Sequence, residues 1–139
     1  MKIGIYGGNV RRGAPLTSVV DDIVDMEQRG FASYWTPQVG TFDALTMIGL
    51  AGGRTSTIEM GTAVVPTYPR HPSTLAQQAA TANALAGGRL VLGVGPSHKP
   101  GIEEGLGLKY DRPALHTREY VSVLKALAAE GRVDFQGDI

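Results

Sequence analysis

Residues 58–94 read IEMGTAVVPTYPRHPSTLAQQAATANALAGGRLVLGV, and this stretch decides the fold. It opens with a β-prone apolar run over 58–65 and closes with a second one over 90–94. Between the two runs, Pro72 suits the first position of a helix, which Gly87 and Gly88 then end. The apolar stripe of that helix has four members at helical spacing: Leu75, Ala79, Ala82 and Ala86. A strand, a helix and a second strand in this order are typical of a parallel sheet.

The same alternation continues on both sides of this stretch. Short β-prone runs at 2–6 and 31–36 precede helical patterns at 15–29 and 43–52, and a last helical pattern follows at 113–130. The chain of 139 residues therefore holds four β–α units of about 35 residues, close to the roughly 31 of a (β/α)8 barrel. A complete four-stranded open sheet is the alternative. Residues 95–113 are expected to form a long glycine-rich loop.

Helix capping is predicted at two places. Asp43 can cap the helix over 43–52, with Phe42 and Met47 as a hydrophobic staple across that cap. His71 precedes the helical Pro72, so capping is its simplest role. The acidic residues of the first helix, Asp21, Asp22 and Asp25, are expected to form a solvated face rather than a metal site.

Composition excludes several classes of function. Thirteen basic against 13 acidic side chains give no basic surplus for nucleic acid or an anionic membrane. The absence of cysteine excludes disulfides, a thiolate nucleophile and iron–sulfur ligation. No apolar run approaches the roughly 18 residues that span a bilayer. We therefore expect a soluble cytoplasmic protein without a metal, whose partner is a small-molecule substrate.

Chemistry in parallel α/β proteins gathers at the carboxyl ends of the strands, which here fall in four loops, at 7–14, 37–41, 66–71 and 95–113. Gly93-Val94-Gly95 begins like a dinucleotide fingerprint, but the third glycine is missing, so a nucleotide-binding open sheet has little support. A nucleotide-binding open sheet would be favoured again if the first strand were central in the sheet.

Several further positions bear on a possible site, and most of them allow two interpretations. His98 follows a strand end beside Ser97, and it is either a ligand contact or a plain loop residue. His116 is expected at the surface of the last helix. Tyr34 and Trp35 suit either the core or the wall of a pocket, and the small residues over 61–66 suit either tight packing or the approach of a flat ring.

Three stretches together resemble the bacterial luciferase-like monooxygenase family, and within it the branch of deazaflavin-dependent oxidoreductases. They are residues 61–72, residues 75–78 and residues 87–95, in which R-H-P, G-G-R and L-G-x-G follow one another at the family's spacing. The resemblance covers essentially the whole chain but corresponds only to the first half of the family's barrel. It implies an α/β fold with four β/α units, the N-terminal half of a (β/α)8 TIM barrel, and hydride transfer on coenzyme F420 or FMN.

The resemblance also implies where a cofactor would lie. Members commonly have a bulge and a non-prolyl cis peptide in the third strand, which falls here around Ala63 and Val64. The cofactor-binding residues implied in this way are Thr36, Gln38, Ala63, Val64, Val65, Gly95 and Ser97. Many deazaflavin members place a catalytic histidine or acid after the second strand, where this chain reads Thr36-Pro37-Gln38. His98 is the substitute, and it is our candidate catalytic residue.

The expected organisation is a single partial domain over residues 1–139, a half-barrel with its first and fourth strands unpaired at the two edges. Two hypotheses follow. The first is a fragment of an F420- or FMN-dependent oxidoreductase, active as a homo-oligomer or with a complementing half-barrel. The alternative is a non-catalytic half-barrel that self-associates through its first and fourth strands.

Overall fold

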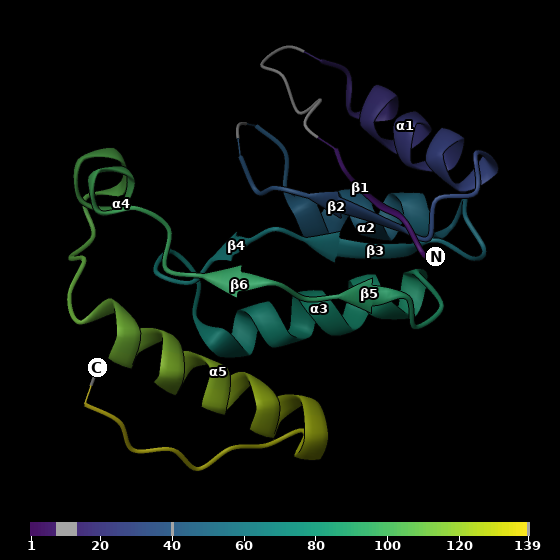
Figure 1. Cartoon of the computed structure of the whole chain (residues 1–139). Helices are drawn as coiled ribbons and strands as arrows, with labels where there is room; N and C mark the ends of the chain where they lie inside the picture. The colour runs from purple at the N-terminus through teal and green to yellow at the C-terminus, as the bar shows by residue number, and fades with distance from the viewer. Residues whose placement is uncertain (8–13, 40, 139) are drawn as a thin grey trace. The chain divides into compact units, whose positions relative to one another are not determined.

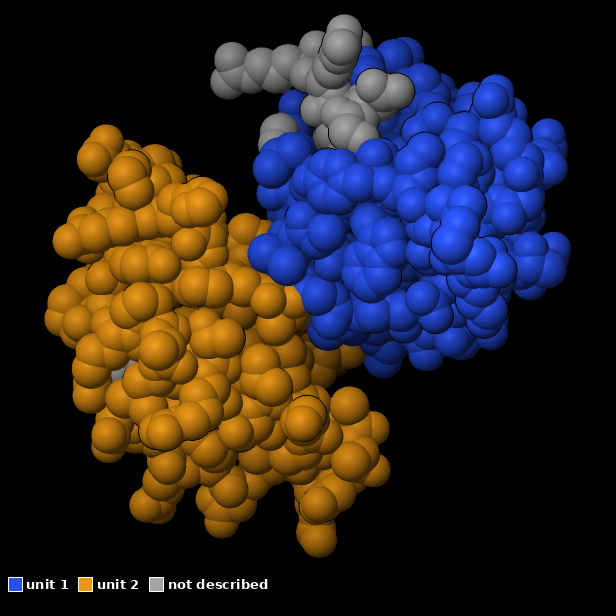
Figure 2. All heavy atoms as spheres, viewed as in Figure 1, with its two compact units in different colours: residues 1–65, 79–93 blue, residues 66–78, 94–139 orange. Residues whose placement is uncertain are grey.

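The computed structural model describes residues 1–7, 14–39 and 41–138 (Figure 1). Most of the predicted loop over 7–14, and residue 40 of the loop over 37–41, lie outside the described residues. The chain divides into two compact units, which Figure 2 colours separately. The first unit comprises residues 1–65 and 79–93, and the second comprises residues 66–78 and 94–139. Each unit is described by itself.

The first unit is built on a four-stranded parallel sheet. Its strands, in spatial order, are β1 (Gly4–Tyr6), β2 (Ser33–Thr36), β3 (Glu59–Thr62) and β5 (Leu90–Val91). The parallel sheet predicted from the β–α alternation is confirmed. Because β1 lies at an edge, the condition that would have favoured a nucleotide-binding open sheet is not met.

Helices α1 (Leu16–Gln28) and α2 (Ala44–Gly52) cover one face of this sheet together with the end of α3 (Pro72–Leu85). Their apolar stripes meet the sheet residues in one buried cluster. Its largest members are Ile23, Tyr34, Ile48, Ile58 and Met60. At Gly52, a Cβ would lie 2.6 Å from the Cα of Ala86, so only glycine lets α2 approach the end of α3 this closely.

Several helix ends follow the sequence prediction. The Asp43 carboxylate accepts the Thr46 N–H at 2.8 Å and caps α2, while Phe42 packs beside Met47 as the staple requires. At the start of α3, the Ser73 N–H donates to His71 Nδ1 at 3.3 Å, so the capping role of His71 is confirmed. Helix α1 begins one residue later than predicted, with Pro15 as its N-cap.

The third and fourth predicted strands are each interrupted. Residues 58–65 divide into β3 and β4 (Val65–Pro66), and residues 90–94 divide into β5 and β6 (Val94–Gly95), which pairs with β4. The Thr62 hydroxyl explains the break in the ladder. It donates to the Gly93 carbonyl at 2.8 Å and accepts the Gly93 N–H at 2.9 Å, so a side chain replaces the backbone pairing at this point.

The second unit contains α4 (Lys99–Leu106) and α5 (Pro113–Glu130). The prediction of a continuous loop over 95–113 is wrong, because α4 occupies its middle. Gly101 and Gly105 lie inside this short helix and conceal its periodicity, while its apolar anchor, Ile102, is fully buried. Helix α5 begins at Pro113, where the predicted loop was expected to end, and it buries Tyr120, Val123 and Leu124.

Candidate functional site

The sheet of the first unit has two chemically different faces. Neighbours in a parallel sheet point to the same side, so the register places Tyr6, Trp35 and Gly61 together on one face. The opposite face carries Tyr34 and Met60, which are buried beneath the helices. The Trp35 indole occupies the space that a Cβ on Gly61 would need, so the glycine lets the ring lie flat against β3. We call Tyr6, Trp35 and Gly61 the inner face.

Tyr34 and Trp35, which the sequence left open between the core and the wall of a pocket, have different roles. Tyr34 is a core residue whose hydroxyl donates to the Asp22 carboxylate at 2.6 Å, and burial together with that carboxylate raises the pKa of Tyr34. Trp35 belongs to the inner face instead. The expectation of a solvated face is therefore wrong for Asp22, although Asp21 and Asp25 do form surface ion pairs.

The peptide bond between Ala63 and Val64 is cis, as the family resemblance implied. The Ala63 N–H donates to the Thr36 carbonyl at 2.9 Å, and the Val65 N–H donates to the Gly93 carbonyl at 2.9 Å. The Val64 side chain between them is 40% exposed. Four of the residues predicted to bind a cofactor therefore lie together at the carboxyl end of β2 and β3.

The side chains of Thr36 and Gln38 are arranged differently from one another. Thr36 is buried, and its hydroxyl has no hydrogen-bond partner among the residues that the structure describes. Alternation along β2 places Thr36 on the helix-covered face with Tyr34, away from the inner face. The side-chain amide oxygen of Gln38, Oε1, accepts the Ala44 N–H at 3.2 Å and so caps the first turn of α2.

The remaining predicted residues, Gly95, Ser97 and His98, belong to the second unit. The Gly95 carbonyl accepts the Thr67 N–H at 3.0 Å, and the Ser97 carbonyl accepts the Tyr110 hydroxyl at 3.2 Å. Ser97 has a φ of 64°, a left-handed conformation that few residues other than glycine adopt. His98 is exposed at the N-cap of α4, where its side chain makes no capping bond.

An aromatic stack in the second unit was missed by sequence reasoning. The Tyr68 ring lies between two others, with centroids 4.9 Å from Tyr110 and 4.0 Å from His116. His116 is half-buried rather than at the surface, and its Nε2 lies 3.0 Å from the Thr67 hydroxyl. Burial lowers the pKa of His116, which keeps the imidazole neutral near pH 7. No local spacing joins Tyr68 to His116, although His116 also lies beside Tyr120, one helical turn later, with ring centroids 5.7 Å apart.

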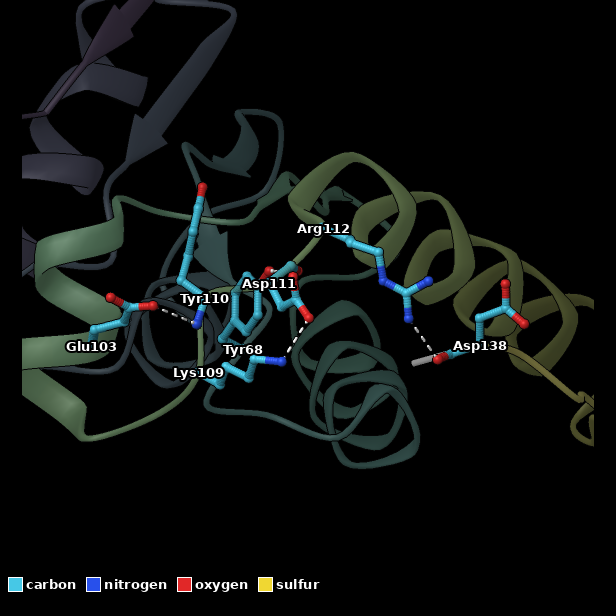
Figure 3. Close-up of polar contacts among 7 residues, drawn as sticks. All are labelled: Tyr68, Glu103, Lys109, Tyr110, Asp111, Arg112 and Asp138. Atoms are coloured by element: carbon cyan, nitrogen blue, oxygen red, sulfur yellow. Dashed lines mark hydrogen bonds and ion pairs between the residues drawn. The ribbon is translucent and has the colours of Figure 1, made fainter.

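Figure 3 shows how polar contacts hold the segment before α5. The Tyr68 hydroxyl donates to the Asp111 carbonyl at 2.6 Å, and Lys109 pairs with the Asp111 carboxylate at 2.8 Å, which lowers the pKa of Asp111. The Tyr110 N–H donates to Glu103 at 3.2 Å. These bonds fix Tyr110, whose hydroxyl in turn supports the backbone at Ser97.

The described residues offer neither a metal-binding cluster nor a membrane-spanning helix. Within residues 1–7, 14–39 and 41–138, no three histidine or acidic side chains are grouped so that they could hold a metal ion. In the same part of the chain, no helix combines the length and apolar character needed to cross a bilayer.

Four parallel β–α units with a cis peptide at the end of the third strand define half of a (β/α)8 barrel. The family model described as luciferase-like monooxygenase matches residues 2–139, and the chain belongs to that family.

Individual relatives agree with this assignment. The chain is 32% identical over 136 residues to an F420-dependent glucose-6-phosphate dehydrogenase of Intrasporangium calvum, an alignment that covers 86% of the chain and 40% of the relative. It superposes on the coenzyme F420-dependent tetrahydromethanopterin reductase of Methanopyrus kandleri with a TM-score of 0.84 and 25% identity, covering 98% of the chain and 42% of the reductase.

A more distant structure shares the fold. The oxygenating constituent of 3,6-diketocamphane monooxygenase from Pseudomonas putida, solved with FMN, superposes with a TM-score of 0.83 and 17% identity over 99% of the chain and 42% of that protein. The chain thus spans about two-fifths of the length of these relatives.

Proposed function

We propose that residues 1–139 form one partial domain of an oxidoreductase. This domain supplies the part of a cofactor site that the first four strands of the barrel form. The cofactor is coenzyme F420, with FMN as the alternative, and the reaction transfers hydride to or from a small organic substrate. The observation that carries this proposal is the inner face of Tyr6, Trp35 and Gly61, with the exposed Val64 at the carboxyl end of β3. The F420-dependent relatives named above support it.

The inner face has the chemistry that a flat ring system requires. The Trp35 indole lies over Gly61 and donates its N–H to Ser33 Oγ at 3.1 Å, and Tyr6 beside Trp35 is 61% exposed, so the inner face offers aromatic surface. The exposed Val64 adds an apolar contact that excludes water. Aromatic and apolar walls with few polar groups are typical of small-molecule sites. These residues therefore fit the ring of a flavin or deazaflavin.

A bound flavin or deazaflavin would supply the hydride chemistry, and the protein would bind and orient it. In this proposal, Trp35 and Val64 hold the ring and exclude water. Thr36 supports the site through its backbone carbonyl, which accepts the Ala63 N–H at 2.9 Å. Gly95 and Ser97 are kept as predicted cofactor contacts. His98 is kept as the candidate catalytic residue that the family resemblance implied.

A cofactor titration of the 139-residue chain tests the proposal. We expect the fluorescence anisotropy of F420 or of FMN to rise to saturation as protein is added. Val64→Asp should weaken that binding at least tenfold, because it buries a carboxylate without a partner against an apolar ring surface. Leu50→Asp is the matched control, since Leu50 is similarly exposed but lies on α2, and it should leave the affinity unchanged. Absence of a saturable change with both cofactors would contradict the proposal.

The open edges of the sheet favour a second candidate, a non-catalytic half-barrel that self-associates. Strands β1 and β5 each have one neighbour among the described strands of the first unit. Unpaired edges are templates for pairing with another chain. The exposed Ile3, adjacent to β1, has none of the charge that normally protects such an edge.

The mass of the protein in solution tests this second candidate. If the edges pair, light scattering should give twice the chain mass of 14.7 kDa, and Ile3→Lys should return the protein to a monomer. Leu106→Lys introduces the same charge at an equally exposed position on α4 and should leave the dimer intact. A monomeric wild-type protein would rule this candidate out.

A further inference from the structure

The second unit contains a cavity of about 520 Å³ that the proposed cofactor site does not use. Its walls come from the loop at 67–72, from one side of α5 and from the segment that follows α5. Pockets for small molecules usually measure about 300–1,000 Å³, so the volume suits a ligand rather than a single water.

One part of the wall has unused hydrogen-bonding capacity. Tyr120 is 5% exposed, and its hydroxyl has no hydrogen-bond partner in the part of the chain that the structure describes. Burial raises the pKa of Tyr120 to about 12, although Arg70 opposes this, so the hydroxyl keeps its proton and can donate it. Glu119 accepts the Asp138 N–H with Oε1 at 3.2 Å, while its buried Oε2 is unpaired within residues 1–7, 14–39 and 41–138.

The rest of the wall is apolar and its charges are balanced. Val123, Val133 and Phe135 contribute aliphatic and aromatic surface. Arg70 and Glu119 both line the cavity, so a cationic and an anionic group oppose each other there. A ligand with a net charge would meet a like charge in either case, whereas a neutral ligand avoids that cost.

We propose that this cavity is a binding site for a small neutral ring compound that carries a hydroxyl group, with phenol as the simplest representative. The hydroxyl uses the free hydrogen-bonding capacity of Tyr120 and Glu119, and the ring packs against Val123 and Phe135. Burying a polar side chain without a partner is costly. A ligand whose hydroxyl bonds to Tyr120 and Glu119 should therefore bind more tightly than a purely apolar ligand. The proposal does not depend on the cofactor site, so failure of either leaves the other standing.

Saturation-transfer NMR on the 139-residue chain, with phenol as the probe, tests the site. We expect saturable binding that Tyr120→Phe weakens about fivefold, the effect of one lost hydrogen bond. Tyr6→Phe removes a hydroxyl from the exposed Tyr6 of the other unit and should not change the affinity. Benzene, which lacks the hydroxyl, should bind less tightly than phenol to the wild-type protein.

A second variant keeps the test decisive if the Tyr120 substitution disturbs folding. Phe135 lies outside the helices and is 41% exposed, so Phe135→Ala should preserve the circular dichroism spectrum while reducing phenol binding severalfold. Three outcomes would overturn the proposal: no saturable phenol signal, unchanged affinity in both variants, or benzoate binding at least as tightly as phenol. The last result would indicate an anion site at Arg70 instead.

Discussion

Arg89→Met is expected to lower the free energy of unfolding by about 3 kcal/mol, because Arg89 donates four hydrogen bonds to the connection between α2 and β3. Its Nη1 donates to the Ile58 carbonyl and the Thr55 hydroxyl, both at 2.9 Å. Its Nη2 donates to the Thr55 carbonyl at 2.8 Å and the Gly52 carbonyl at 3.1 Å. Methionine preserves the length of the apolar stem but leaves these partly buried acceptors without their donor. Urea unfolding followed by Trp35 fluorescence measures the change.

A surface arginine of the same unit provides the control. Arg54 pairs with Asp21 at 2.7 Å, but both side chains are more than half exposed, so Arg54→Met should cost less than about 1 kcal/mol. Arg89→Lys should recover less than half of the loss, since an ammonium group cannot reproduce the planar fork of guanidinium donors. If Arg89→Met and Arg54→Met cost the same, the hydrogen bonds of Arg89 contribute no more to the stability of the fold than a surface ion pair.

The parts of the fold that could be predicted from the sequence are those that depend on a local pattern of residues. Pro72 and the glycines after α3 mark helix boundaries directly. Asp43 marks the start of α2, because a carboxylate at that position accepts a backbone N–H of the first turn. The break between β3 and β4 has no local signal of that kind. It depends on Thr62 bonding to Gly93, a residue 31 positions away, so only the family resemblance indicated it.

The candidate site was predictable to a smaller extent. Ala63 and Val64 were placed correctly because the resemblance fixed their position, and alternation along β2 would have separated Tyr34 from Trp35 had the buried face been known. The stack of Tyr68 and His116 joins a loop to a helix 48 residues later, and no spacing rule reaches across that interval. Residues brought together by tertiary packing, such as Tyr120 and Phe135 in the cavity, were therefore not foreseen.

The resistance of the first unit to acid should depend on Glu27. One carboxylate oxygen of Glu27 accepts the backbone N–H groups of Ser56, Thr57 and Ile58 at 2.6–2.9 Å, and so organises the turn that leads into β3. Partial burial raises the pKa of Glu27, but these hydrogen bonds outweigh it and lower the pKa from 4.5 to about 2. Since the folded protein holds the proton less tightly than the unfolded chain, the stabilisation is complete above pH 4.5 and is lost as the pH falls toward 2.

Glu27→Gln should therefore lower the free energy of unfolding at pH 7 by about 2 kcal/mol, below the roughly 3 kcal/mol that the pKa difference alone would give, because solvent partly screens the carboxylate. The variant should also lose less stability than the wild type between pH 4.5 and pH 2, since the amide has no proton to take up. Glu59→Gln, at an exposed carboxylate of the same unit, should change neither quantity by more than about 0.5 kcal/mol. Parallel pH profiles for Glu27→Gln and the wild type would mean that these three backbone N–H groups do not depend on the charge of Glu27.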